Sequence, residues 1–172
     1  MKKIRLIVFW LTLSGIIIWM TLILLAPYLR VRYPILSGLI YASFSPVCHQ
    51  IPSRCFYLFG FPLAVCSRCL GIYFGFFTGV LAYPIIRGFS KSALPNTRTF
   101  LFLSTPIVLD TIGNFWGLWS TSLWFRFFFG LSWGIILPYY FITGLIELFL
   151  HLKNTRKTSL TFPCFEQSKK IK

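Results

Sequence analysis

The hydrophobic positions of this chain fall into long runs, and the polar positions gather between them. Residues 6–26 form the first run, which at about 20 residues is long enough to cross the hydrocarbon core of a bilayer. Residues 70–86, 99–119 and 124–150 form three further apolar runs. This pattern predicts an all-α integral membrane protein with about four transmembrane helices.

A shorter apolar segment, residues 35–47, lies between the first two of these runs. With about a dozen residues it is too short to cross a bilayer, so we expect a short re-entrant or interfacial helix there. Residues 1–150 then form a single transmembrane domain, in which residues 46–69 are a loop rich in cysteine. Residues 151–172 are expected to form a basic cytoplasmic tail.

Glycines in the second predicted transmembrane helix share one face. Gly71, Gly75 and Gly79 are spaced four residues apart, which places them on the same side of a helix. Small residues at this spacing let two helices approach closely in lipid, so we expect this face to pack against another helix. Gly130 and Gly134 repeat the spacing in the last predicted helix.

The composition favours lipid as the surroundings of the chain. The 172 residues are 56% hydrophobic and 20% aromatic, and 12% are charged, which is about half the usual share for a soluble domain. The net charge is +14, but the basic residues lie between and outside the apolar runs rather than along one polar face. We therefore expect contact with the lipid bilayer and not with nucleic acid, while protein partners stay unknown.

The distribution of Lys and Arg predicts the orientation of a multi-pass protein in the plasma membrane. Cytoplasmic loops carry an excess of these residues. With four transmembrane helices and a cytoplasmic start, 12 basic residues fall inside and three fall outside, so both termini are expected in the cytoplasm and the cysteine-rich loop at the outer face. The inner residues are Lys2, Lys3, Arg5, Arg87, Lys91, Arg98, Lys153, Arg156, Lys157, Lys169, Lys170 and Lys172; the outer residues are Arg30, Arg32 and Arg54.

The candidate chemistry is concentrated at the end of this loop. Cys66 and Cys69 form a Cys-x-x-Cys pair, a spacing that brings two sulfur atoms together and suits a tetrahedral thiophilic metal. Cys48 and His49 lie upstream and offer further ligands, and Cys55 or water could complete the set. The leading interpretation is a site for zinc or another thiophilic transition metal.

The same cysteines suit two other roles. Cys66 directly precedes a predicted helix, so the helix dipole and the charge of Arg68 are expected to lower its pKa. The protein would then be a membrane thiol–disulfide oxidoreductase that uses Cys66 and Cys69. A structural disulfide is a third possibility for an outward-facing pair. A component of a metal or small-solute transporter is a further functional class, and whether the protein is an enzyme stays open.

Charged residues within the apolar runs form a second candidate site. An ionised side chain is costly there, which draws attention to Asp110 and Arg126 on either side of a short turn. We expect them to form either a structural ion pair or a functional polar site. Arg54 and Arg68 could offset the negative charge of a thiolate-rich site, or be ordinary interfacial arginines.

Several motifs resemble a family of small predicted prokaryotic membrane proteins, catalogued as domain of unknown function 2085. The motifs are Cys48-His49-Gln50, Arg54-Cys55-Phe56, Cys66-x-Arg68-Cys69-x-Gly71-Ile72-Tyr73-x-Gly75, and then Pro106, Asp110, Arg126, Gly130 and Gly134.

This resemblance implies one shared site but no known activity. It argues against Cys55 as an essential ligand, because serine is expected at that position, and asparagine is expected where Ser122 stands. The residues implied in the shared site are Cys48, His49, Cys66, Cys69, Asp110 and Arg126.

The predicted orientation can be tested with single-cysteine variants. A membrane-impermeant thiol reagent applied to intact, reduced cells should label Cys48 or Cys66 and spare Cys164, because only the first two are expected outside. Labelling of Cys164 without labelling of Cys66 would show the opposite orientation.

Overall fold

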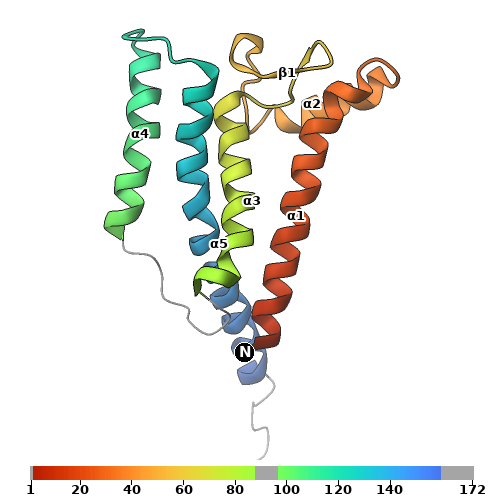
Figure 1. Cartoon of the computed structure of the whole chain (residues 1–172). Helices are drawn as coiled ribbons and strands as arrows, with labels where there is room; N and C mark the ends of the chain where they lie inside the picture. Colours follow the sequence, from red (N-terminus) through yellow and green to blue (C-terminus); the bar gives the residue numbers. More distant parts are fainter. Residues whose placement is uncertain (1, 88–96, 160–172) are drawn as a thin grey trace, which may run out of the picture.

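Long helices lie side by side in the part of the chain that the computed structural model describes, residues 2–87 and 97–159 (Figure 1). The predicted connector around Lys91 and the tail residue Cys164 lie outside these ranges. The helices are α1 (Lys2–Leu29), α2 (Pro34–Phe44), α3 (Ser67–Arg87), α4 (Thr97–Phe115) and α5 (Leu123–Ser159).

Three of the described helices, α1, α3 and α5, are long and apolar enough to cross a membrane. Three of the four predicted transmembrane helices are therefore supported by the structure. The run at 99–119 does form a helix, α4, but this helix ends at Phe115 and is not among the three. Polar residues explain the difference, because Asp110 and Asn114 interrupt the apolar character of α4. It lies alongside α5 and antiparallel to it (Figure 1).

Helix ends extend past the predicted apolar runs. α3 begins at Ser67 rather than at residue 70, so Cys69 and Arg68 belong to its first turn. α5 continues to Ser159, beyond the predicted end at residue 150. Polar residues can continue a helix outside the hydrocarbon layer, where water is available, and hydropathy alone therefore underestimates helix length.

The predicted short helix is present as α2, which lies across one end of the bundle (Figure 1). The hydroxyl of Ser37 donates a hydrogen bond to the carbonyl oxygen of Ala26 in α1 at 2.8 Å. Phe44 packs edge-on against Trp19 of α1, with ring centroids 4.8 Å apart. These contacts fix α2 against the end of α1. Its re-entrant or interfacial character stays a prediction.

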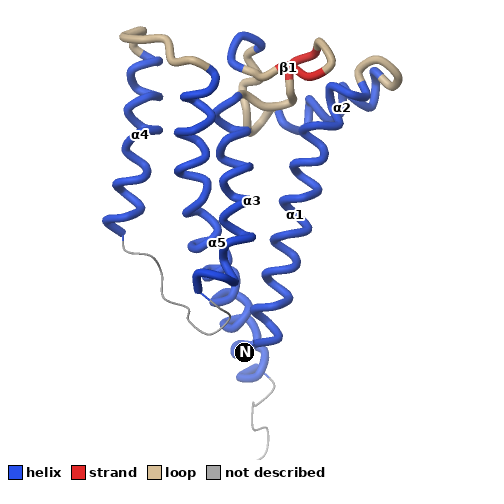
Figure 2. Tube along the Cα trace, in the orientation of Figure 1, coloured by secondary structure: helices blue, strands red, loops and turns tan. Residues whose placement is uncertain are grey.

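The loop between α2 and α3 contains a 3-10 turn, η1 (Pro52–Arg54), and a hairpin of β1 (Tyr57–Leu58) and β2 (Phe61–Pro62), red in Figure 2. Phe59 and Gly60 form the hairpin turn with φ angles of 53° and 81°. Two consecutive residues with positive φ are what the common two-residue hairpin turn requires. The hairpin reverses the chain and returns it to the end of α2.

The closest helix contact joins α3 to α5. A Cβ atom added to Gly71, Gly75 or Gly79 would lie 2.1–2.4 Å from backbone carbonyl oxygens of α5. Gly130 and Gly134 of α5 would meet carbonyl oxygens of α3 at 2.3 Å. No side chain fits at such distances, so the two backbones touch along five glycines. The structure thus places the predicted glycine face against α5.

Two buried apolar clusters hold α1 against this pair of helices. One joins α1 to α3 and α5 and includes Val8, Val80 and Ile142. The other lies beneath α2 and includes Cys48 together with residues 63–65. The second cluster therefore fixes both chain segments that lead to the candidate metal ligands.

The glycine contact yields a direct test of the α3–α5 packing. Gly75→Leu should lower the thermal midpoint of the protein in detergent, because the new side chain must separate two touching backbones. Overpacking of this kind costs about 1–3 kcal/mol or more. Gly144→Leu is the matched control, since a Cβ at Gly144 meets nothing within 4 Å. Equal midpoints for the two variants would contradict the close contact.

Candidate metal centre and the cleft beside it

Three cysteine sulfurs gather at one end of the bundle. The Sγ atoms of Cys48, Cys66 and Cys69 all lie within 4.8 Å of one another. Cys48 follows α2, Cys66 directly precedes α3 and Cys69 lies in the first turn of α3. Sulfur ligands sit about 2.3 Å from a tetrahedral zinc ion, which places them about 3.8 Å apart. Small rotations of these side chains would reach that spacing.

Backbone hydrogen bonds hold Cys48 in place. Its N–H donates to the carbonyl oxygen of Phe44 at 3.0 Å, which continues the last turn of α2. Its sulfur accepts a hydrogen bond from the backbone N–H of Cys66 at 3.1 Å. Cys48 is buried, with 5% of its surface exposed. The first ligand candidate is thus tied to the start of α3, where the other two lie.

Gln50 joins the two chain segments behind the cysteines. Its Nε2 donates to the carbonyl oxygen of Tyr41 at 2.7 Å and to that of Ala64 at 2.8 Å. The phenol of Tyr41 in turn donates to the carbonyl oxygen of Pro62. Sequence reasoning noted Gln50 only as part of a motif. Its bridging role depends on a hairpin that brings Ala64 back to α2. The sequence alone could therefore point to Gln50 only through its position in the motif.

Hydrogen bonds among the sulfurs separate their proton affinities. Donation from the side chains of Cys66 and then Cys69 lowers the pKa of the Cys48 thiol to about 2. The pKa of Cys66 is raised, chiefly because its proton is held in the hydrogen bond to Cys48. This corrects the expectation that the helix dipole and Arg68 lower the pKa of Cys66. The backbone N–H of Cys69 at the start of α3 does lower the pKa of Cys66, but the hydrogen bond to the Cys48 sulfur outweighs it.

The remaining ligand candidates stand apart from these three. Cys55 is fully buried, and its Sγ donates to the carbonyl oxygen of Ile51 at 3.2 Å. Burial raises the pKa of Cys55 to about 12, so it stays a neutral thiol outside the cluster. His49 is exposed and lines the neighbouring cleft, but it is not part of the group of three sulfurs.

A cleft of about 470 Å³ opens beside the cysteines. The three cysteines and His49 line it together with residues of α3, α4 and α5. Its charged lining residues are Arg54, Arg68 and Arg126. The structure therefore brings the predicted thiol site and the predicted basic residues to one place.

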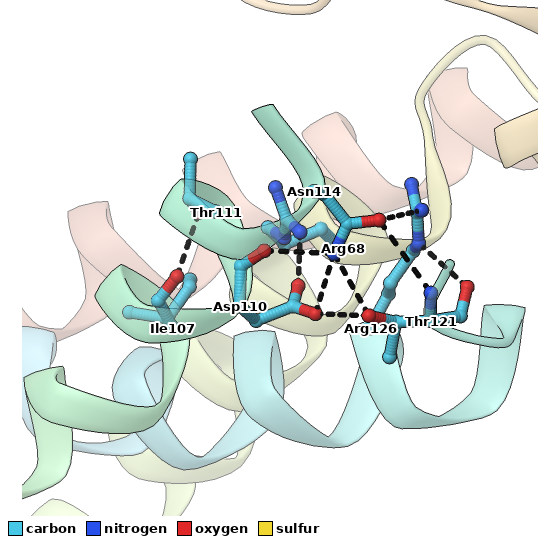
Figure 3. A network of polar contacts seen from close by, with 7 residues as sticks. All are labelled: Arg68, Ile107, Asp110, Thr111, Asn114, Thr121 and Arg126. Carbon is cyan, nitrogen blue, oxygen red and sulfur yellow. Dashed lines mark hydrogen bonds and ion pairs between the residues drawn. The ribbon is translucent and has the colours of Figure 1, made fainter. Parts of the chain in front are cut away.

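Asp110 forms its ion pair with Arg68, as Figure 3 shows. Of the two roles left open for Asp110 and Arg126, the direct ion pair between them is not formed, and a shared polar site stays a prediction. Arg126 instead donates from Nε to the carbonyl oxygen of Thr121 at 2.9 Å, and another of its nitrogens donates to Asn114 Oδ1. The reason is the helix arrangement, because Arg68 opens α3 at the same end of the bundle and reaches across to α4. Asp110 is 3% exposed.

Asn114 connects the ion pair to Arg126. Its Nδ2 donates to Asp110 Oδ1 and to Thr121 Oγ1, at 2.8 Å in both cases, while its Oδ1 accepts from Arg126 (Figure 3). The sequence analysis did not single out Asn114. Its spacing from Asp110 was the missed signal, because residues four apart lie on the same face of a helix.

The corrected ion pair can be tested by a double-mutant cycle. Arg68→Ala and Asp110→Ala should each destabilise the protein, because either change leaves a buried charge without its partner, at a cost of about 3–5 kcal/mol. The double variant should lose less stability than the sum of the losses in the two single variants. Thermal midpoints in detergent give the comparison. A cycle between Asp110 and Arg126 is the control, and a larger coupling there than between Asp110 and Arg68 would contradict the assignment.

Comparisons with known proteins identify the relatives of the chain. The sequence profile of a family described as "Predicted membrane protein (DUF2085)" matches residues 48–140, which confirms the resemblance found from the motifs. An uncharacterized protein of Methanocaldococcus jannaschii is 32% identical over 154 residues, which cover 86% of this chain and 96% of the relative. An uncharacterized protein of Methanothermobacter thermautotrophicus is 35% identical over 92 residues, which cover 54% of this chain and 81% of the relative. No solved structure gives a significant match. The chain therefore belongs to the DUF2085 family of predicted membrane proteins.

Proposed function

We propose that this membrane protein binds a thiophilic transition metal, most simply zinc, through Cys48, Cys66 and Cys69. One observation carries the proposal: three sulfurs from two separate chain segments lie within 4.8 Å of one another. Zinc is commonly held by cysteine thiolates in this kind of group, often with one Cys-x-x-Cys pair.

The surroundings of the sulfurs support metal binding. The backbone N–H of Cys66 points at the Cys48 sulfur, and hydrogen bonds of this kind orient a ligand and stabilise its thiolate form. Gln50 holds the two ligand-bearing segments together without taking part itself. Three protein ligands leave a fourth position on the ion for water, a substrate group or His49, which lines the same cleft.

We further propose that the metal centre faces the outside of the cell. α2 and the loop that leads from it to α3, which together carry the cysteines into the site, lie at the opposite end of α1 from the N-terminus (Figure 1). A cytoplasmic N-terminus, as the basic residues predict, would place that end at the outer face of the plasma membrane. The centre would then meet metal ions and small molecules that arrive from outside.

A thiol–disulfide oxidoreductase is the second candidate function. Its specific support is the location of Cys66 and Cys69 at the start of α3, with all three sulfurs close enough for exchange after small movements. The raised pKa of Cys66 weakens it, because the attacking sulfur in such an enzyme must be a thiolate. Metal binding needs thiolates as well, but the positive ion itself displaces their protons when it binds.

Metal analysis of the purified protein tests the leading proposal. Protein purified anaerobically should carry about one zinc ion per chain. Cys48→Ser, Cys66→Ser and Cys69→Ser should each lower the metal content by tenfold or more, because each removes one of three ligands. His49→Ala should have a smaller effect. Cys55→Ser is the matched control, since Cys55 is buried nearby but outside the cluster.

A free-thiol count on the same samples separates the two candidates. Wild-type protein without bound metal, together with a Cys66–Cys69 disulfide that opens and closes with reductant and oxidant, would refute the metal proposal in favour of the oxidoreductase. Loss of metal from Cys55→Ser as severe as from Cys66→Ser would show that the ligand set is wrong.

A further inference from the structure

The cleft beside the cysteines has more positive charge than its described lining residues neutralise. Arg54, Arg68 and Arg126 all line it. The whole chain has three acidic residues, and Asp110 is already paired with Arg68. No carboxylate lines the cleft among the residues that the structure describes. Within the described residues, the cleft therefore offers no carboxylate to balance the charges of Arg54 and Arg126.

The proposed metal centre balances only part of this charge. A zinc ion with three thiolates carries one net negative charge, whereas Arg54 and Arg126 carry two positive charges. One positive charge remains beside the centre. A cleft between helices is a poorer solvent for charge than water, so an uncompensated cation there attracts an anion strongly.

Donors for such an anion are present at the cleft wall. The guanidinium of Arg126 has five N–H groups, and its hydrogen bonds to Thr121 and Asn114 use two of them. The guanidinium of Arg54 is exposed at the same cleft. Arginine presents its donors in a fork that matches the oxygens of a carboxylate or a phosphate.

Ser67 gives an independent sign of a missing polar partner. It is fully buried at the cleft wall, and among the described residues its hydroxyl has no hydrogen-bond partner. Buried hydroxyl groups in folded proteins nearly always have such a partner. Ser67 also opens α3, a helix of 21 residues, whose first backbone N–H groups have no acceptor within the helix. Helix starts of this kind bind anions readily.

We infer that the cleft binds a small oxyanion group, phosphate or carboxylate, between Arg54, Arg126 and the start of α3, next to the three cysteines. The inference names the class of ligand that the proposed metal centre would meet, and it rests on that function only for the charge of the loaded centre. The arginines, the Ser67 hydroxyl and the cleft are present without a metal. The oxyanion could belong to a soluble molecule or to the headgroup of an anionic lipid.

Inorganic phosphate is the probe for the site. Its binding to the purified full-length protein in a neutral detergent can be followed by titration calorimetry, with zinc-loaded and metal-free samples measured in parallel. Arg54→Gln should weaken binding tenfold or more, because it removes a guanidinium from the cleft. Arg32→Gln is the matched control, since it removes the same charge from an exposed position at the same end of the bundle, outside the cleft lining. Ser67→Ala should weaken binding without changing the net charge.

The arms of this experiment separate the two proposals. Phosphate binding by both samples, with loss in Arg54→Gln, supports the oxyanion site whether or not the protein holds zinc. Equal affinities for Arg54→Gln and Arg32→Gln, or no phosphate binding by correctly folded wild-type protein, would overturn the oxyanion site and leave the metal proposal untouched. Arg54 is exposed, so its substitution is not expected to impair folding.

A competition arm identifies the source of the oxyanion. Protein in nanodiscs of phosphatidylcholine alone is compared with protein in nanodiscs that also contain phosphatidylglycerol. Loss of phosphate binding in the second sample supports an oxyanion site filled by a lipid headgroup. Unchanged binding in both supports a site for a soluble anion.

Discussion

The direct contact between the backbones of α3 and α5 is the constraint on which the rest of the structure depends. Five glycines allow it, and a Cβ on Gly71 would lie 2.1 Å from the carbonyl oxygen of Phe127. In lipid, helix association relies on close packing rather than on the exclusion of water, so such a contact supplies much of the attraction between the two helices. Because the spacing of the glycines is fixed, the contact also sets how far one helix can slide along the other.

The position of α3 in turn determines the candidate site. Its first turn carries Arg68 and Cys69, and its register against α5 brings Arg126 to the same end of the bundle. Arg68 reaches Asp110 and so connects α3 to α4. α4 is joined to α5 by polar contacts, such as the bond from Trp133 Nε1 to Ser104 Oγ at 2.9 Å, and by the ring of Phe100, which packs against Trp133 and Tyr140. The cleft is thus bounded by a direct backbone contact on the side of α3 and α5, and by polar and aromatic side chains on the side of α4.

The sequence predicted the features that depend on regular spacing. The helices at α1, α3 and α5, the glycine face and the Cys-x-x-Cys pair are all readable from neighbours along the chain. The ion pair between Arg68 and Asp110 was not predicted, because the packing of separate helices brings these two residues together. The sequence suggested an ion pair between Asp110 and Arg126 only as one of two alternatives. Gln50 was missed for a similar reason, since its acceptors on Tyr41 and Ala64 meet only after the hairpin forms. The place of His49 outside the sulfur group likewise depends on loop geometry.

The order of the ligands along the chain has a consequence for biosynthesis. Cys48, Cys66 and Cys69 are all synthesised before α5, which supplies Arg126 and the surface on which α3 docks. A nascent chain therefore presents its thiols before the helix that completes their surroundings exists. Until α5 emerges, Gly71, Gly75 and Gly79 have no partner helix, and the thiols have their positive neighbour Arg68 but not Arg126. The complete cleft therefore cannot assemble before α5 has been synthesised.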